Sequence, residues 1–569
     1  MFRLASYSVT KAIEAAIILV SLYHISGCSS SSGVTTTPAS TTTSSSSTPP
    51  QPTDFSVCEE SHFDLTPEVL QHSYDPVNIR LKEGVNPLAG DAVVFAPKDN
   101  ASYSMLRVVA SAADGPDGYV IRPVNPRGGG YRVSYQAANG EVACITDLTF
   151  AQGDDEPTQA YLTVTGDDSL QVNWVSGSSE RGEVLYKKPG TTTWTQFNET
   201  SLARTYKAQD MCSAPATSEA FRDPGFFHSV TIPNVERDSV LQIKTGNGVS
   251  KEFTTSPRLL AGDALRHSVF MVGDLGTSGA GQLGGFSGFG FLQFPPPDPD
   301  RILSHMQQND RIRLSIIYGD LAYANGFSTV WDQFGAEVEH NIGMKQPLVT
   351  SVGNHEYVSF DNPHGWYPPF GNYEFPDSGG ECGVPFTHRY PVGSEEAKYW
   401  YSFDYGLVHY VMISTEHNYL NESDQHNWLE DDLANVDRNK TPWVIVTGHR
   451  PMYTSCALGK FNGDIAEALK SNVAPLFKKY NVSIYFTGHV HAYTRTSAID
   501  GTVHILAGSA RFLNLVCPIG TMPHVEKALS VIGYIELDVV SRSELRGTFW
   551  GYNVTSGEVT VQDTFVVGS

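Results

Sequence analysis

The chain has 569 residues, too many for a single hydrophobic core, so the sequence predicts two to four domains. It carries 38 basic and 61 acidic side chains, a formal net charge of −23. A surface of this sign repels nucleic acid and anionic membranes, which excludes both as general partners. An anionic substrate would need a strong local positive charge, such as a metal cluster, to overcome this field.

The N-terminal region predicts export from the cytoplasm. Residues 1–27 have the outline of a signal peptide, with an apolar stretch at 15–22 that is too short for a membrane span. The following ISGC is similar to the lipidation box of bacterial lipoproteins, which makes Cys28 the candidate for a lipid anchor. Residues 28–57 form a Ser/Thr/Pro-rich linker without a core. We therefore expect a secreted protein, or alternatively one anchored at the cell surface through Cys28.

The remaining cysteines and the N-x-S/T sequons agree with an extracellular location. No CxxC pattern occurs, so the cysteines predict up to three disulfides in an oxidising compartment rather than a zinc ribbon. These six residues are Cys58, Cys144, Cys212, Cys382, Cys456 and Cys517. The six candidate glycosylation sites are Asn100, Asn198, Asn421, Asn439, Asn481 and Asn553.

Two strand-rich segments precede a segment of a different pattern. Residues 58–153 and 154–259 hold short apolar runs bounded by turn residues, and both are expected to be β-sandwiches that serve as scaffold. In one of these runs, alternation places Leu170, Val172 and Trp174 on one face. From residue 260 to 569 apolar runs alternate with helix-like stretches such as 299–310, which predicts an α/β domain.

The sequence GAGQLG at 279–284 fits the GxGxxG pattern of dinucleotide-binding proteins. That pattern requires a helix to begin on the glycines, but the chain continues as GFSGFGFLQFPPPDPD. We therefore expect a loop near a site and set aside a dinucleotide-dependent oxidoreductase.

Five apolar runs of the α/β domain end in a glycine followed by side chains that can bind metal. In α/β sheets, ligands bind at the carboxyl ends of strands, so these side chains are expected to meet at one sheet edge. A single Gly-Asp or Gly-His is usually ordinary turn chemistry; the repetition within one domain is what indicates a metal site. The residues are Asp274, Asp320 with Tyr323, Asn354 with His355, His449, and His489 with His491.

The order GDLG, GDLAY, GNHE, VTGH and GHVH resembles the five sequence blocks of the purple acid phosphatases, within the calcineurin-like metallophosphoesterases. The resemblance covers roughly residues 157–569. It implies a fibronectin type III-like sandwich at 154–259 and a metallophosphoesterase domain at 260–569 with a C-terminal extension. The fold class is thus multidomain, with N-terminal β-sandwiches followed by an α/β domain of two mixed β-sheets flanked by helices. Some longer plant-type members have a further N-terminal β-domain, as at 58–153.

The resemblance also implies a ligand set for two metal ions, with Asp320 bridging them. Fe(III) would be surrounded by Asp274, Asp320, Tyr323 and His491. A divalent Zn, Mn or Fe ion would be surrounded by Asp320, Asn354, His449 and His489. The types of ligand atom agree with this assignment of the two ions. Carboxylate and phenolate oxygens suit a hard trivalent ion, whereas imidazoles and an amide suit a borderline divalent one. His355 is expected to donate a hydrogen bond to phosphate or a proton to the leaving group.

One departure concerns a pair of histidines that many plant members carry about ten residues after the fourth block. The corresponding stretch here, RPMYTSCALGKFNG at 450–463, contains no histidine. Protonation of the leaving group would then fall to His355 or to a substrate-lining residue. Among these residues His417 is the first candidate, followed by Tyr453 and His388, although a histidine at such a position is more often a solvated loop residue.

The sequence therefore predicts a secreted binuclear acid phosphatase that hydrolyses small phosphate monoesters by attack of a metal-bound hydroxide on phosphorus. A nucleotide pyrophosphatase/phosphodiesterase or a phytase of the same fold is the alternative. A non-catalytic adhesion or carbohydrate-binding protein is a remote alternative. Such a protein would be expected to lack some of the metal ligands, whereas all seven positions here carry residues that can bind metal. The sequence leaves a homodimer open.

Overall fold

A computed structural model describes most of the chain after residue 61. The described residues are 62–99, 106–109, 118–166, 168–199, 203–218, 220–237, 239–246, 252–256, 259–277, 299–358, 377–391, 399–456, 458, 460–510, 513, 522–553 and 556–568. The predicted signal peptide, the linker with Cys28, and the GAGQLG loop lie outside them, as do Cys58, Cys517 and Asn100.

The first strand-rich segment forms two sheets around one apolar core. One sheet has the order β1 (Phe63–Thr66), β3 (Val77–Leu81), β6 (Tyr119–Ile121). The other has the order β2 (Val69–Leu70), β8 (Val142–Phe150), β7 (Tyr131–Gln136), β4 (Ala92–Pro97), β5 (Leu106–Val109). Inward-facing residues such as Ile79 and Val133 are fully buried between the sheets. We call this unit the first sandwich.

The second strand-rich segment, the second sandwich, also has two sheets. Their orders are β13 (Phe226–Ile232), β10 (Ser169–Ser176), β9 (Thr158–Gly166), and β12 (Thr195–Asn198), β11 (Glu183–Lys187), β14 (Gln242–Thr245), β15 (Glu252–Thr254). Leu170, Val172 and Trp174 are buried in its core, as the alternation along β10 predicts. A short 3-10 turn, Ala208–Asp210, lies between β12 and β13.

The C-terminal domain contains two mixed sheets, which confirms the predicted fold class. The six-stranded sheet has the order β18 (Leu348–Ser351), β17 (Ile312–Tyr318), β16 (His267–Val272), β26 (Ile532–Ser541), β27 (Glu544–Asn553), β28 (Glu558–Gly568). The seven-stranded sheet has the order β19 (Tyr401–Tyr405), β20 (Val408–Met412), β21 (Trp443–Thr447), β22 (Ile484–Thr487), β24 (Thr502–Ala507), β23 (Tyr493–Ile499), β25 (Val525–Leu529). Strands β16, β17 and β18 are parallel, and so are β20, β21, β22 and β24.

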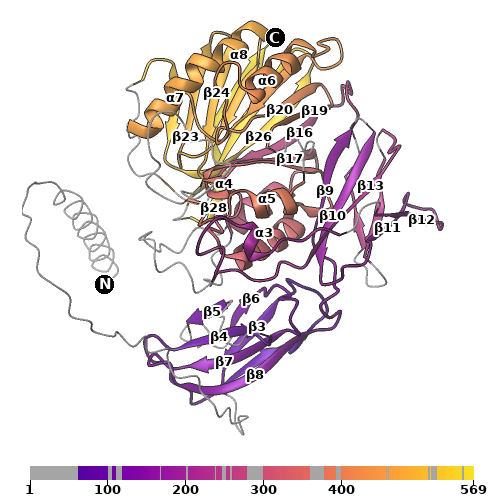
Figure 1. Ribbon diagram of the computed structural model, residues 1–569, viewed down its shortest axis with the longest axis vertical. Helices are drawn as coiled ribbons and strands as arrows, with labels where there is room; N and C mark the ends of the chain where they lie inside the picture. The colour runs from indigo at the N-terminus through magenta and orange to yellow at the C-terminus, as the bar shows by residue number, and fades with distance from the viewer. Residues whose placement is uncertain are drawn as a thin grey trace, which may run out of the picture. The chain divides into compact units, whose positions relative to one another are not determined.

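The two sheets pack face to face with helices on their outer faces. Along β16, Val269 and Met271 point into a core shared with β20, β21 and β22, whereas Phe270 and Val272 point toward α2 (Pro299–Gln307) and α3 (Ser328–Val338). On the far side, α6 (Asp424–Ala434), α7 (Lys460–Asn472) and α8 (Ala474–Tyr480) cover the seven-stranded sheet (Figure 1). Strands β16, β18, β20, β21 and β22 are therefore buried on both faces, which explains why these runs read as continuous apolar stretches.

A buried ionic junction joins both sandwiches to the C-terminal domain. Asp332 of α3, only 2% exposed, accepts hydrogen bonds from Arg127 (2.5 Å) of the first sandwich and Gln159 (3.0 Å) of the second. It also accepts one from Arg389 (3.0 Å) at the end of α5 (Val384–Arg389). Removing one member of this group would leave buried charge without a partner, so these hydrogen bonds couple the three segments energetically.

A disulfide adds a covalent link between the second sandwich and the C-terminal domain. Cys212 is bonded to Cys382, across 170 residues of chain. The backbones run together beside it, with the Cys212 N–H donating to Gly380 O at 2.8 Å. Cys144 and Cys456 are also disulfide-bonded, in agreement with an oxidising compartment.

None of the helices in the described ranges has the length and apolar character that a membrane span requires.

One buried histidine should make the stability of this domain depend on pH. His409 of β20 lies between Asp404 (2.7 Å) and Asp432 (3.0 Å). Burial alone would lower the pKa of His409, but the hydrogen bonds to the two carboxylates outweigh it and raise this pKa to about 9. The charged ring therefore stabilises the folded state fully below the unfolded pKa of about 6.5, and this contribution is lost as pH rises through about 9.

We expect the wild type to be more stable than His409→Gln at pH 6. The difference between their free energies of unfolding should be smaller at pH 10, by on the order of 2 kcal/mol. Urea denaturation at both pH values measures this difference. A gap that stays constant with pH would show that the histidine is not charged in the folded state.

Candidate metal centre

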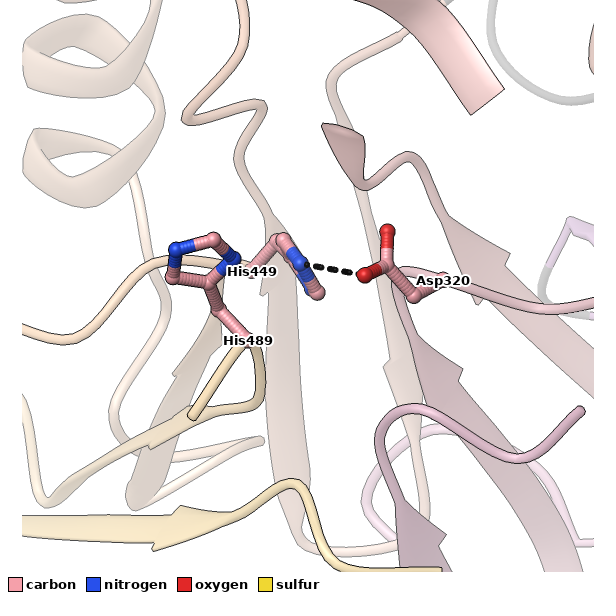
Figure 2. A group of neighbouring side chains, drawn as sticks. All are labelled: Asp320, His449 and His489. Carbon is pink, nitrogen blue, oxygen red and sulfur yellow. Dashed lines mark ion pairs between the residues drawn. The ribbon is translucent and has the colours of Figure 1, made fainter. Parts of the chain in front are cut away.

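Four of the predicted ligands form one group at the ends of β17, β18, β21 and β22. Asp320, His449 and His489 each offer a ligand atom, and these atoms lie within 4.8 Å of one another. Asp320 Oδ2 is 3.1 Å from His449 Nε2, as the dashed line in Figure 2 marks. Asn354 Oδ1 lies between the rings, 2.9 Å from His449 Nε2 and 2.8 Å from His489 Nδ1.

The other three predicted ligands form a second group beside the first. The Tyr323 hydroxyl donates to Asp274 Oδ1 at 2.8 Å and lies 2.9 Å from His491 Nε2. His491 Nε2 is 3.3 Å from the same carboxylate oxygen. The two groups are joined because the His489 N–H donates to Asp274 Oδ2 at 2.9 Å.

The structure thus brings all seven predicted ligands together, although their role in binding metal stays a prediction. The sequence predicted that these side chains meet at the edge of one sheet, but they come from two sheets. Asp274, Asp320 and Asn354 follow strands of the six-stranded sheet, whereas His449 and His489 follow strands of the seven-stranded one. The candidate centre therefore lies where the carboxyl ends of two sheets meet.

The backbone at this centre adopts a conformation that side chains other than glycine rarely take. Asp274 (φ 58°), Asp320 (φ 50°), Tyr323 (φ 53°) and His489 (φ 69°) are all left-handed. Such strain persists only where the surrounding structure enforces it, and it is concentrated at functional sites. Four of the seven candidate ligands share it, which separates this cluster from ordinary strand-end turns.

Two of the glycines that precede the candidate ligands, Gly319 and Gly488, are required because a side chain there would collide with a ligand. A Cβ on Gly319 would lie 2.4 Å from His449 Nδ1, and one on Gly488 would lie 2.3 Å from Asp274 Oδ2. Each glycine belongs to one sheet and the ligand it faces belongs to the other. Any side chain at these positions would push the two halves of the centre apart.

Glu356, in the GNHE block, is a buried organising residue that sequence reasoning did not single out. Its Oε2 accepts the N–H groups of Asp320 and Gly353, both at 2.9 Å, and its Oε1 accepts that of Leu321 at 2.8 Å. One carboxyl group thus ties the end of β17 to the end of β18. The available signal was its place two residues after Asn354, at the start of the short helix α4 (Asn354–Tyr357).

The electrostatics favour an ionised Asp320 and a neutral phenol, whereas burial and then the Asp320 charge raise the pKa of Glu356 to about 8. Burial alone would raise the pKa of Asp320, but the facing rings of His449 and His355 hold it well below its usual range. Burial and then the Asp274 charge raise the pKa of Tyr323 well above its ordinary value. Removal of the phenolic proton therefore requires a strong cation close to this oxygen.

His355 lies against both groups. Its backbone N–H donates to Asp320 Oδ1 at 2.9 Å, and its ring centroid is 4.4 Å from that of Tyr323. The ring Nδ1 is 2.8 Å from Asn325 Oδ1, which can only accept, so Nδ1 carries the proton and Nε2 is left for other partners. Asn325 is a second residue that the sequence reasoning missed, although it lies only two positions after Tyr323.

The other predicted substrate-lining residues have different surroundings. His417 is stacked between the rings of Tyr357 (4.0 Å) and Tyr399 (4.1 Å), and burial lowers its pKa to about 3. The ring is thus uncharged in weak acid, and the residue is partly buried rather than fully solvated. Tyr453 packs on the ring of His504 at 4.6 Å, and His388 packs edge-on against Tyr206 at 5.3 Å, near the second sandwich.

The donor set fits a pair of metal ions of different hardness. The group with Tyr323 offers phenol and carboxylate oxygens plus one imidazole, and the group with Asp320 offers two imidazoles, an amide oxygen and a carboxylate. In both groups the ligand atoms face one another rather than solvent. Hard trivalent and borderline divalent ions prefer these two sets, respectively.

Comparison with known proteins places this geometry in a family. A family model described as calcineurin-like phosphoesterase matches residues 268–493. A protein of Arabidopsis thaliana named "Probable inactive purple acid phosphatase 1" is 30% identical over 404 residues, covering 65% of this chain and 63% of that protein. "Purple acid phosphatase 1" of Ipomoea batatas is 27% identical over 360 residues, covering 59% and 66%. The match thus spans less than two thirds of either relative.

Among solved structures, the purple acid phosphatase PPD1 from yellow lupin seeds has a TM-score of 0.73. It is 23% identical, and the match covers 89% of this chain and 95% of that one. The two mixed sheets and the strand-end blocks agree with the calcineurin-like phosphoesterase model that matches residues 268–493. In sequence and in fold, the chain is similar to the purple acid phosphatases.

We expect Gly488→Ala to lower the metal content of the purified protein by at least about half and to destabilise it by about 1–3 kcal/mol, because the new methyl group displaces Asp274. Gly568→Ala is the matched control, since a Cβ there meets nothing within 4 Å. Metal analysis and thermal unfolding of both variants check this. Full metal content in Gly488→Ala would contradict the steric argument.

Proposed function

We propose that this protein hydrolyses phosphate monoesters at acid pH, at a centre of two metal ions. The observation that carries the proposal is the convergence of seven metal-competent side chains in two adjoining groups. The backbone of His489 links them, since its ring belongs to one group and its N–H donates to Asp274 of the other.

Asp274, Tyr323 and His491 would hold Fe(III), and Asn354, His449 and His489 would hold Zn, Mn or Fe in the divalent state, with Asp320 shared. Such a pair of ions supplies positive charge for the phosphate oxygens and lowers the pKa of water. Local positive charge is needed here, because the chain as a whole carries −23 and repels anions.

His355 is the residue we assign to the leaving group. Since Asn325 fixes the Nδ1 proton, a second proton on Nε2 is the one available for donation. Nε2 lies 3.9 Å from Asp320 Oδ2, beside the ligand groups. His417 is not suited to this role, because a pKa of about 3 leaves its ring unprotonated in weak acid.

The word "inactive" in the names of four Arabidopsis thaliana relatives makes a non-catalytic protein of this fold the alternative to test. All seven candidate ligand positions of this chain carry side chains able to bind metal, which favours activity. The substrate is left to experiment, and nucleotide pyrophosphatase, phosphodiesterase and phytase activities belong in the same panel.

We further propose secretion, with small phosphorylated molecules rather than nucleic acid as substrates. The disulfides favour an oxidising compartment. The sequon asparagines within the described ranges are all exposed, as glycosylation requires: Asn198, Asn421, Asn439, Asn481 and Asn553.

The decisive experiment is metal analysis of the purified protein together with activity at pH 5 on phosphomonoesters, ATP, phytate and diesters. We expect Asp320→Asn to lose metal and to lower kcat/KM by at least about a thousandfold, equivalent to about 4 kcal/mol. Asp310→Asn is the matched control, since the Asp310 side chain is 98% exposed. A phenolate bound to Fe(III) would give the protein a charge-transfer absorption in the visible range, so Tyr323→Phe should abolish this absorption while part of the activity remains.

Wild-type protein that binds two metals but cleaves none of these substrates would favour the non-catalytic alternative. Unchanged metal content in Asp320→Asn would remove this residue from the ligand set.

A further inference from the structure

The ring of His489 has one nitrogen turned toward the candidate centre and one turned away (Figure 2). Nδ1 faces Asn354 Oδ1 at 2.8 Å. Nε2 lies 3.1 Å from Asn462 Oδ1 and 3.0 Å from Arg450 Nη1. Both of these partners belong to the 450–463 stretch, where other family members carry the histidine pair.

Arg450 fixes the orientation of the Asn462 amide. Its side chain is 2% exposed and is held by Glu416, with Nε donating to Oε1 at 2.8 Å and Nη2 to Oε2 at 3.0 Å. Nη1 donates to Asn462 Oδ1 at 2.7 Å. A guanidinium group has only donors, so the amide oxygen of Asn462, rather than its NH₂ group, must face this corner.

The neutral His489 ring has two proton arrangements, which differ in how they use the Arg450 contact. With the proton on Nδ1, the ring donates to Asn354 Oδ1 and accepts from Arg450 at Nε2. With the proton on Nε2, the ring donates to Asn462 Oδ1 and leaves the Nδ1 lone pair free toward the centre; Arg450 Nη1 can then no longer donate to Nε2 and must turn wholly to Asn462 Oδ1. Only the second arrangement can bind a cation through Nδ1, because a metal-bound nitrogen carries no proton.

We propose that Asn462 is a positioning residue that presents Nδ1 of His489 to the divalent ion, with Glu416 and Arg450 holding the amide in place. This inference rests on the proposed function, since it presupposes the metal centre. It gives the 450–463 stretch a role in metal binding in place of the missing histidines. It also explains why a salt bridge is buried directly behind a candidate ligand.

The test is the affinity of the protein for Mn²⁺, measured by electron paramagnetic resonance of the free ion on protein from which the divalent ion has been removed. Asn462→Leu removes the acceptor and should weaken Mn²⁺ binding by about 10–100-fold. Asn462→Asp keeps an acceptor oxygen and should bind Mn²⁺ at least as tightly as the wild type. Asn472→Leu, at the far end of α7, controls for loss of an asparagine from the same helix.

Equal Mn²⁺ affinity in Asn462→Leu and wild type would overturn the proposal. So would equal weakening in the Leu and Asp variants, because a packing defect does not distinguish an acceptor oxygen from a methyl group. Wild-type protein that binds no Mn²⁺ and no iron would overturn the proposed function and this inference with it.

Discussion

The candidate centre depends on the absence of a side chain at the points where the two sheets meet. Gly319 and Gly488 allow ligands of one sheet to lie within van der Waals reach of the backbone of the other. Each ligand is therefore fixed by both sheets at once, through packing and through hydrogen bonds such as that from His489 N–H to Asp274. A centre assembled in this way is as rigid as the cores beneath it.

The left-handed turns that follow the strands solve a second problem, the burial of acidic groups. Asp274, Asp320 and Glu356 are all nearly inaccessible, and burial of carboxylates is costly unless they are compensated. The turns direct backbone N–H groups inward, so that Asp320 accepts from His355 and Glu356 accepts from three donors. Bound cations would complete this compensation, which is consistent with a chain that is otherwise strongly acidic.

Much of this could be predicted from the sequence, because each ligand follows a local pattern of apolar strand, glycine and polar residue. The order of the blocks also predicted the family, and the alternation in β10 predicted its buried face. The contacts that could not be predicted join residues distant in sequence. Asn354 and His489 meet across 135 residues, and Arg450 and Glu416 pair across 34. The depressed basicity of His417 likewise results from rings that only the tertiary fold stacks around it.

The ionic junction at Asp332 has a consequence for dissection of the protein. A fragment starting near residue 260 would retain every candidate ligand, yet it would lack Arg127 and Gln159, two of the groups that compensate this carboxylate. It would also carry Cys382 without its bonding partner. The division into modules visible in the sequence is therefore not a division into autonomous folding units, and the two sandwiches belong to the minimal folded protein rather than to its periphery.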